Sequence, residues 1–325
     1  MISEMTSVVF MGTPQFAAPI LEGLVTNGYD VKAVVTQPDR YTGRKRVLTA
    51  SPVKEMALKH GIKVLQPEKI SGSPEMQEII ELQPDLIVTA AFGQFLPTKL
   101  IQAAKIGAIN VHGSLLPKYR GGAPVQYAIM NGDDKTGVTI IYMVKQMDAG
   151  AMLAQKEMPI GPKDDTASIF EKMSLLGRDT LLEMLPHLIA GEIKPVEQDE
   201  SKVVFSPTIK PAEESLSLEL TAKELDWKIR ALRPAPGAYF ADFKGKRTKL
   251  WEIEPLAQTT EFEAGTVVEV SKHELILAAA ENTTYSVKIL QPAGKPKLKI
   301  TDYLNGVGQG LKVGQKVISD GKEDK

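Results

Sequence analysis

The chain has 325 residues, of which 43% are hydrophobic and 24% charged, and its formal net charge is −1. This balance is typical of a globular protein with two domains, and it excludes a global positive field that would attract nucleic acid or membrane. Cysteine is absent, which excludes disulfides and thiolate catalysis, and no apolar run approaches the roughly 20 residues of a membrane span, so we expect a cytoplasmic protein without membrane contact.

Short apolar strands alternate with helix-like stretches over the first roughly 200 residues, which favours an α/β fold with a parallel sheet. Strands are expected at residues 7–11, 31–36, 85–90, 107–109 and 137–144, and a long helix at 166–189. Prolines then indicate a linker at about 191–211. We therefore expect a first domain over residues 1–206.

The remaining residues, 207–325, follow a different pattern. A helix is expected at 225–232, where Pro234 and Pro236 end it. Short alternating strands follow, including 265–270, 274–278 and 285–290. Strands of this length and spacing favour a small β-barrel of the OB type.

The run at 110–117 gives the strongest indication of chemistry. Val111 lies between Asn110 and His112, so in a strand the two polar side chains share one face. Buried strands do not place Asn and His at their carboxyl ends for packing, because each needs hydrogen-bond partners. In an open α/β sheet that end is where ligands bind.

A carboxylate follows the next strand, in the turn at 145–150. Asp148 stands before Ala-Gly, where an Asp is usually a turn former. Here it would lie at the end of a strand that neighbours the one bearing His112, and there it could orient the imidazole and stabilise its charged form. The sequence therefore predicts a site of Asn110, His112 and Asp148.

Linked motifs resemble the folate-dependent formyltransferases. NVHGSLLPKYRGGAP (110–124) and MDAG (147–150) are similar to the family core. VVFMGTPQFAAPIL (8–21), TQPDRYTGRKR (36–46) and SPVKEMA (51–57) resemble the members that act on methionyl-tRNA. The resemblance is strong over residues 8–161 and weaker beyond. It implies a Rossmann-like, mostly parallel sheet followed by an OB-like domain that binds tRNA, and a monomer.

The resemblance also implies the reaction: the formyl group of 10-formyltetrahydrofolate passes to the α-amino group of methionyl initiator tRNA, for translation initiation. Asn110 and the charged His112 ring would donate to the oxygen that gains charge, and Asp148 would stabilise the ring and relay the amine proton. No metal is expected, since the sequence has no HExxH or paired-histidine spacing. The implied folate-binding residues are Phe92, Gly93, Leu96, Ser114, Leu115, Leu116 and Pro117.

The tRNA contacts that the resemblance implies each have a simpler reading. Phe16 would lie beside the methionine side chain, or only pack in the core. The loop at 40–46 would grip the acceptor stem, or remain a solvated charge run. Lys210 would substitute for a lysine that the family often has near Thr208 and that is absent here, as is the family's tryptophan near Ala235. The cations of the loop are Arg40, Arg44, Lys45 and Arg46.

Three alternatives stay open. A formyltransferase acting on another amine, such as a ribonucleotide or a nucleotide-linked amino sugar, would show the same core. An RNA-binding module with a degenerate core need not retain Asn110, His112 and Asp148 together. A formyl-folate hydrolase or dehydrogenase fragment would pass the formyl group to water or to a carrier thiol.

Overall fold

The computed structural model describes residues 5–43 and 46–319. The chain divides into two compact units. The first consists of Met1–Pro124, Lys135–Pro159 and Ile169–Pro207, and the second of Val125–Asp134, Ile160–Ser168 and Thr208–Lys325. Two short segments from the earlier part of the chain thus pack with the second unit, which the proline pattern did not indicate. The boundary expected between residues 206 and 207 stays a prediction.

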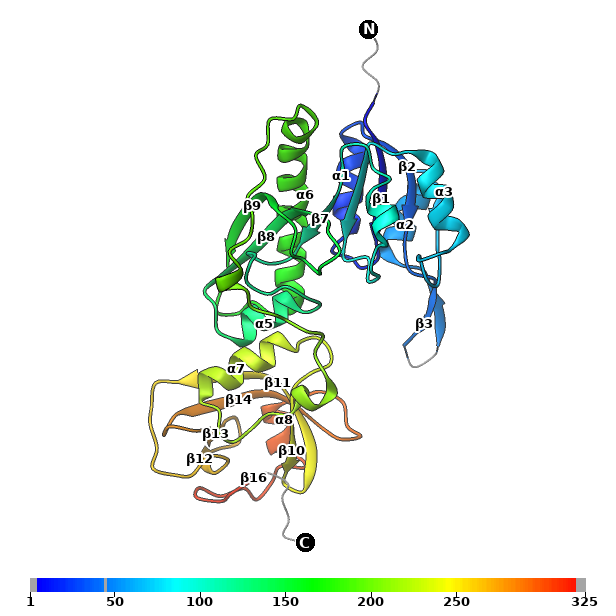
Figure 1. Ribbon diagram of the computed structural model, residues 1–325. Helices are drawn as coiled ribbons and strands as arrows, with labels where there is room; N and C mark the ends of the chain where they lie inside the picture. Colours follow the sequence, from blue (N-terminus) through cyan, green and yellow to red (C-terminus); the bar gives the residue numbers. More distant parts are fainter. Residues whose placement is uncertain (1–4, 44–45, 320–325) are drawn as a thin grey trace. The chain divides into compact units, whose positions relative to one another are not determined.

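The first unit is built on a seven-stranded sheet of order β5-β2-β1-β6-β7-β8-β9 (Figure 1). The strands from β5 to β7 pair in parallel, whereas β8 is antiparallel to both of its neighbours. The predicted α/β class with a mostly parallel sheet is therefore confirmed. The strands are β1 (Ser7–Gly12), β2 (Asp30–Val35), β5 (Val64–Leu65), β6 (Leu86–Ala90), β7 (Gly107–His112), β8 (Lys135–Tyr142) and β9 (Met152–Pro159).

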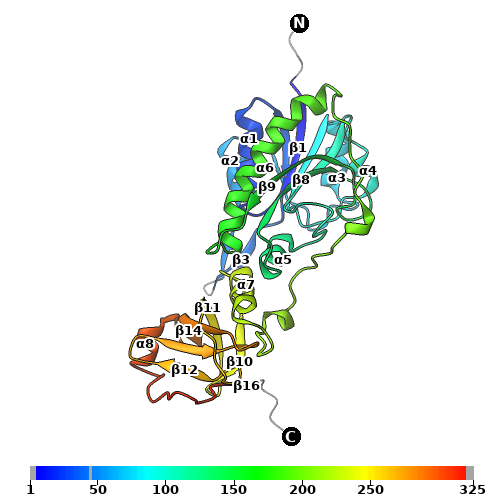
Figure 2. The same ribbon diagram turned by 90° about the vertical axis from the view of Figure 1, so that its left-hand side faces the viewer.

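Helices cover both faces of this sheet, and α6 lies across one of them in Figure 2. Val8 and Phe10 of β1 are fully buried on one face, while Val9 and Met11 pack in a second cluster with Ile79 of α3. Burial on both faces explains why the strands are continuously apolar. The helices are α1 (Ala18–Thr26), α2 (Pro52–Lys59), α3 (Pro74–Leu82), α4 (Thr98–Ile101) and α6 (Thr166–Ile189), and a 3₁₀ turn spans Glu200–Lys202.

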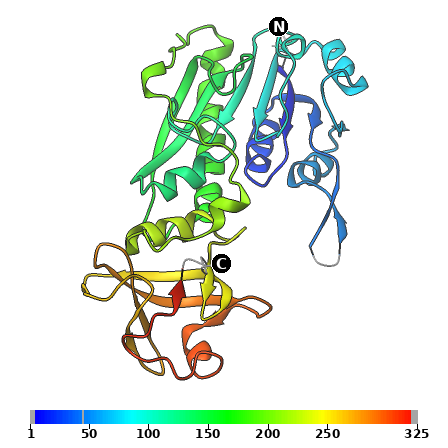
Figure 3. The same cartoon turned by 60° about the horizontal axis from the view of Figure 1, so that its bottom comes forward.

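The expected basic loop forms a short antiparallel hairpin of β3 (Arg40–Thr42) and β4 (Val47–Thr49). It projects from the body of the first unit in Figures 1 and 3. The side chains of Tyr41, Val47 and Leu48 are all more than half exposed. The hairpin thus contributes almost nothing to the core.

The second unit is an antiparallel sheet of order β12-β13-β14-β11-β10-β16, with β15 paired to β14. A bridge between Thr266 and Lys316 brings the two ends of the sheet together, so the sheet curls on itself (Figure 3). The predicted small OB-like domain is confirmed. Its strands are β10 (Tyr239–Phe243), β11 (Lys246–Leu256), β12 (Val267–Val270), β13 (Leu275–Ala278), β14 (Thr284–Pro292), β15 (Leu298–Lys299) and β16 (Ile318–Ser319).

Helices α7 (Ala222–Ala231) and α8 (Ile300–Leu304) contact the strands of this sheet. Helix α5 (Pro124–Met130) comes from the earlier part of the chain, and a 3₁₀ turn spans Pro211–Glu214. Met130 packs against the core of the second unit, and the buried Arg230 donates to the carbonyl of Asp164 at 2.7 Å. A Cβ atom on Gly132 would come within 2.5 Å of the Trp227 ring, so the chain approaches α7 closely there.

Candidate functional site

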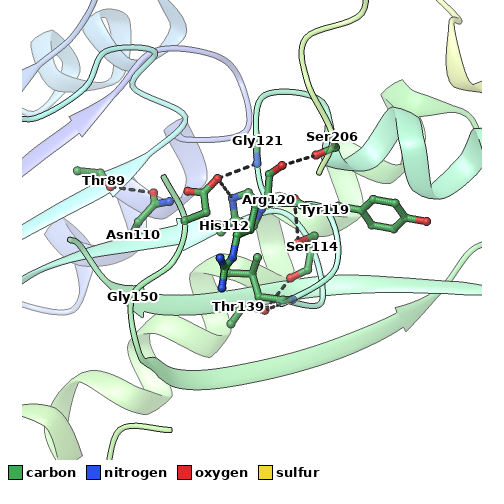
Figure 4. A network of polar contacts seen from close by, with 12 residues as sticks. Thr89, Asn110, His112, Ser114, Tyr119, Arg120, Gly121, Thr139, Gly150 and Ser206 are labelled. Atoms are coloured by element: carbon green, nitrogen blue, oxygen red, sulfur yellow. Dashed lines mark hydrogen bonds and ion pairs between the residues drawn. The ribbon is translucent and has the colours of Figure 1, made fainter. Parts of the chain in front are cut away.

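The carboxyl ends of β6 and β7 bring the first polar residues together. Thr89 on β6 lies in register with Asn110 on β7, and Asn110 and His112 share one face of β7 (Figure 4). His112 pairs in register with Thr139 of β8, so the predicted adjacency of these two strands is confirmed.

Asp148 reaches this cluster by a route that the sequence did not indicate. Because β7 and β8 are antiparallel, Tyr142 at the end of β8 pairs with Ile109, towards the start of β7. The loop 143–151 returns from there and places the Asp148 carboxylate Oδ2 at 3.6 Å from the His112 Nδ1 atom. The loop, not the end of the strand, delivers the carboxylate.

The His112 ring is buried, with only 6% of the residue exposed, and its orientation is fixed. Its Nε2 atom lies 2.9 Å from the carbonyl oxygen of Tyr119. Since a carbonyl can only accept, Nε2 is the donor, which assigns the proton to this nitrogen. The Nδ1 atom is then the nitrogen that faces Asp148.

The Asp148 carboxylate is held by the main chain. The N–H of Gly121 donates to its Oδ2 atom at 2.9 Å. Asp148 itself has a left-handed backbone, with φ 51°, as do Tyr119 at 65° and Ala91 at 48°. Such conformations are unfavourable for residues with a Cβ atom and are retained where surrounding contacts enforce them, often at functional sites.

Asn110 is oriented by one neighbour. The Thr89 hydroxyl donates to the Asn110 Oδ1 atom at 2.8 Å, which fixes the amide so that its NH₂ group is the free end. In the part of the chain that the structure describes, no residue accepts a hydrogen bond from that NH₂ group. The arrangement therefore offers a preoriented donor beside His112.

The predicted folate-binding turn at 114–117 is rigid. The Ser114 hydroxyl donates to the Lys118 carbonyl at 2.7 Å, and the Thr139 hydroxyl donates to the Ser114 carbonyl at 2.7 Å. The Leu116–Pro117 peptide is cis, and Leu116 is buried. Leu115 is half-buried. The hydroxyl of Ser114 is thus used within the turn, and a ligand would meet mainly the turn's apolar side chains and backbone.

The second predicted folate segment presents its backbone rather than its side chains. Phe92 and Leu96 are buried in the core under the sheet, with exposures of 4% and 8%. Gly93 between them is exposed and left-handed. Phe95, which the sequence did not single out, is 71% exposed, so this loop carries an exposed aromatic ring.

The predicted tRNA contacts have different surroundings within their own units. Arg40 donates to both carboxylate oxygens of Glu68, at 3.2 and 2.6 Å, and Arg46 lies over the Tyr41 ring. Phe16 is 6% exposed and packs edge to face against Phe170. Lys210 is exposed in the second unit. The predicted contacts Arg44 and Lys45 lie outside the described residues.

The second unit has two runs of cations, at residues 244–249 and 295–299, and one lysine from each run lies over the Trp251 ring. Lys249 on β11 and Lys297 before β15 both lie over Trp251, with their Nζ atoms 5.6 and 3.4 Å from the ring centroid. Nearby on the same strand, the Arg247 guanidinium stacks 3.6 Å from the centre of the Tyr239 ring. The fold therefore unites two basic runs that are separate in the sequence.

Several residues of the site escaped sequence reasoning. Thr89 and Gly121 lie inside predicted elements or quoted motifs, but their contacts are visible only in three dimensions. Gln198 contacts the main chain of the Asp148 loop across 48 to 50 positions of sequence, and Arg120 contacts Gln198 across 78, so neither contact gave a local signal. No group of three or more His, Cys, Asp or Glu among the described residues could hold a metal ion, and none of the described helices is long and apolar enough to cross a membrane.

Fold and site together define an α/β enzyme domain with a polar cluster at its sheet edge, joined to a small antiparallel barrel. The chain belongs to the formyl transferase family: the family model "Formyl transferase" matches residues 5–185, and "Formyl transferase, C-terminal domain" matches residues 208–308.

Curated relatives cover nearly the whole chain. Methionyl-tRNA formyltransferase of Ligilactobacillus salivarius is 73% identical, over 97% of this chain and 99% of its own length. That of Enterococcus faecalis is 56% identical, over 96% of this chain and 100% of its own length.

Solved structures share the fold at low sequence identity. An N-formyltransferase from Helicobacter canadensis superposes with a TM-score of 0.68 at 18% identity, over 89% of this chain and 100% of that chain. HypX from Aquifex aeolicus in complex with tetrahydrofolic acid gives a TM-score of 0.63 at 19% identity, over 96% of this chain and 49% of that chain. The predicted formyltransferase family is confirmed.

Proposed function

We propose that this protein transfers the formyl group of 10-formyltetrahydrofolate to the α-amino group of methionyl initiator tRNA. The names of relatives 56–73% identical over nearly the entire chain support that reaction. The observation that carries the chemistry is the His112 ring, fixed at Nε2 by the Tyr119 carbonyl and facing Asp148 through Nδ1. A reaction on aminoacyl-tRNA also places the protein in the cytoplasm, and we expect it to act as a monomer.

The first task of the site is to stabilise negative charge on the formyl oxygen as the amine attacks. The NH₂ group of Asn110 is a preoriented donor for that oxygen because Thr89 holds the other end of the amide. The protonated His112 ring supplies positive charge beside it. Removing one such donor typically costs ~10²–10³ in turnover.

The second task is to move the proton that the attacking amine loses to the folate nitrogen that leaves. The Asp148 carboxylate accepts this proton and passes it on, because the His112 ring is already protonated. Asp148 and the His112 Nδ1 atom are 3.6 Å apart, so a proton on Nδ1 lies between an imidazole and a carboxylate that stabilises its charge. The Gly121 N–H keeps the carboxylate in place. We assign to this pair the general acid–base role, which contributes ~10²–10⁴ in rate.

The residues present fit a flat, partly apolar cosubstrate. When bound, 10-formyltetrahydrofolate supplies the activated formyl group. Phe95 exposes an aromatic ring in the loop after β6, and Leu115 is half-buried in the rigid turn after His112. We propose that the backbone of Gly93 and the turn 114–117 hold the ring system while Phe92 and Leu96 support the loop from below.

An RNA substrate is supported by two basic surfaces, one in each unit. The hairpin of β3 and β4 presents Arg40 and Arg46, and the second unit presents Lys249 and Lys297 on Trp251. Cations spaced along strands and loops can follow a phosphate backbone, and stacked cations leave donor groups at the rim of the ring. Lys210 and Phe16 stay predicted contacts of the same substrate.

The test is formyl transfer from 10-formyltetrahydrofolate to initiator methionyl-tRNA, with elongator methionyl-tRNA and free methionine as controls. We expect transfer to the initiator alone. Transfer to all three would contradict selection of the tRNA. No transfer to any of them, with the folate still bound, would overturn the proposal in favour of another amine acceptor.

A further inference from the structure

The segment that follows α6 runs back along the loop that supports the candidate site. The N–H of Arg120 donates to the Val204 carbonyl at 2.9 Å, and the N–H of Ser206 donates to the Arg120 carbonyl at 2.8 Å. Figure 4 shows Ser206 beside Arg120. Tyr119 and Gly121, whose backbone groups contact His112 and Asp148, flank Arg120 on either side. The approach is close: a Cβ atom on Gly121 would lie 2.6 Å from the Ser206 carbonyl oxygen.

Gln198 joins this segment to the loop that bears Asp148. Its Nε2 atom donates to the main-chain carbonyls of Asp148 at 2.7 Å and of Gly150 at 2.8 Å. Its Oε1 atom accepts from Nε and Nη2 of Arg120, at 3.0 and 2.9 Å. All donors and acceptors of the amide are therefore used, which fixes its orientation.

Both members of this pair are inside the protein. Gln198 is 7% exposed and Arg120 is 4% exposed. The Arg120 guanidinium also reaches Glu200 at the surface, at 2.7 Å, so its charge is balanced without changing its contacts to Gln198. Burial makes the hydrogen bonds of the amide costly to break, because a buried carbonyl that loses its donor cannot bond to water instead.

The two carbonyls that accept from Gln198 belong to Asp148 and Gly150, in the turn that orients the Asp148 carboxylate. Asp148 has a left-handed backbone, which costs about 1 kcal/mol or more for a residue with a Cβ atom. A turn of this kind relaxes when its hydrogen bonds are removed. Relaxation would move the carboxylate relative to the His112 ring, since the 3.6 Å separation is not itself a hydrogen bond.

We propose that Gln198, held by Arg120, is a positioning residue: it fixes the main chain at Asp148 and Gly150 and so sets the carboxylate against the His112 ring. Only the expected effect on kcat rests on the proposed function; the positioning of Asp148 does not. Gln198 contacts neither substrate in this role, so its loss lowers kcat and leaves KM for both substrates unchanged.

The decisive variant is Gln198→Glu, compared with Gln198→Ala. The glutamate keeps the size and the contact with Arg120 but has no N–H to donate to the two carbonyls. We expect both variants to lower kcat by about ten- to a hundredfold, since misplacement by 1 Å can cost that much. A Gln198→Glu enzyme with wild-type kcat would overturn the proposal, because it would show that only the contact with Arg120 matters.

A matched control makes the same chemical change elsewhere. The Nδ2 atom of Asn27 donates to the Gly23 carbonyl at 2.8 Å at the end of α1. Asn27→Asp should lower thermal stability slightly and leave kcat unchanged. Should Gln198→Glu fail to fold, Arg120→Lys, which keeps the charge but loses the forked contact, tests the same link and should lower kcat in the same direction.

A readout independent of activity separates this inference from the proposed function. The chain has four histidines, so the ring signals of His112 in ¹⁵N-histidine-labelled protein can be assigned with a His112→Gln variant. At one fixed pH, we expect Gln198→Glu to shift the His112 signals and Asn27→Asp to leave them unchanged. Unshifted signals would overturn the positioning role. If the wild-type protein transferred no formyl group, the proposed function would be wrong, and the His112 ring signals would still test the positioning role of Gln198.

Discussion

The candidate site and the hairpin of β3 and β4 belong to the same unit and hold their polar residues in opposite ways. His112 is 6% exposed and fixed at one ring nitrogen by the Tyr119 carbonyl. In the hairpin, Tyr41 is 64% exposed and Arg40 is paired with the exposed Glu68. Contacts within the protein fix the site residues, whereas the exposed side chains of the hairpin are accessible to a partner.

This difference follows from where each lies on the sheet. The site lies where buried strands end, so packing and main-chain hydrogen bonds restrict its side chains. Among the described residues, the two strands of the hairpin pair with each other and not with the seven-stranded sheet. Changes in the site should therefore act on kcat, and changes in the hairpin on the binding of tRNA and its dependence on salt.

The largest effect is expected from the site. His112→Ala and Asp148→Ala should each lower kcat by at least about a hundredfold, because each removes a charge-stabilising or proton-transferring group. Steady-state formyl transfer measures this loss, and a thermal melt checks that the fold remains. Activity within a few-fold of wild type in a folded His112→Ala protein would contradict the mechanism.

A smaller effect tests preorganisation within the site. Thr89→Val removes the donor that orients the Asn110 amide and leaves the packing volume nearly the same. We expect kcat to fall by roughly tenfold, the equivalent of one hydrogen bond, with KM unchanged. Asn110→Ala should lower kcat by a smaller factor in the Thr89→Val background than in the wild-type protein. Equal factors in the two backgrounds would show that the two residues act independently.

The hairpin should respond differently. Arg46→Gln and Arg40→Gln should raise KM for tRNA and reduce the slope of log affinity against log salt by about one each, while kcat at saturating tRNA stays the same. The exposed ion pair of Lys59 with Glu22 provides the control, since Lys59→Gln removes a cation in the same unit. An unchanged salt slope in both hairpin variants would remove the hairpin from the RNA surface.

The smallest effect concerns stability at the opposite end of the sheet. The Ser7 N–H and hydroxyl donate to Asp85 at 2.8 and 2.7 Å and hold the pKa of that carboxyl below its usual range. A lowered folded-state pKa means that the stabilisation is complete above the unfolded pKa of about 3.9 and is lost as pH falls through the folded pKa.

The variant Ser7→Ala should therefore destabilise the protein at pH 7, by an amount on the order of 1 kcal/mol, and progressively less as the pH falls below about 4. Chemical denaturation across this pH range measures the difference. Formyl transfer at pH 7 should be unaffected. A destabilisation that stays constant down to the lowest pH would mean that packing, rather than the carboxylate, dominates at Ser7.

Local patterns in the sequence were sufficient for much of the fold and part of the site. The long helix was expected at 166–189 and α6 spans Thr166–Ile189, because its apolar spacing persists across Pro186. The strand bearing Asn110 and His112 was identified because alternation places both on one face. The catalytic roles of these two residues and of Asp148 stay predictions that the variants above test.

Only the tertiary structure decided what depends on contacts distant in sequence. The antiparallel direction of β8 follows from packing and pairing across the sheet, so the route of Asp148 to His112 could not be inferred from the strand pattern. The contact of Gln198 with the Asp148 loop spans 50 positions. A buried amide satisfied by main-chain carbonyls leaves no periodicity in the sequence, because its partners are backbone groups that every residue shares.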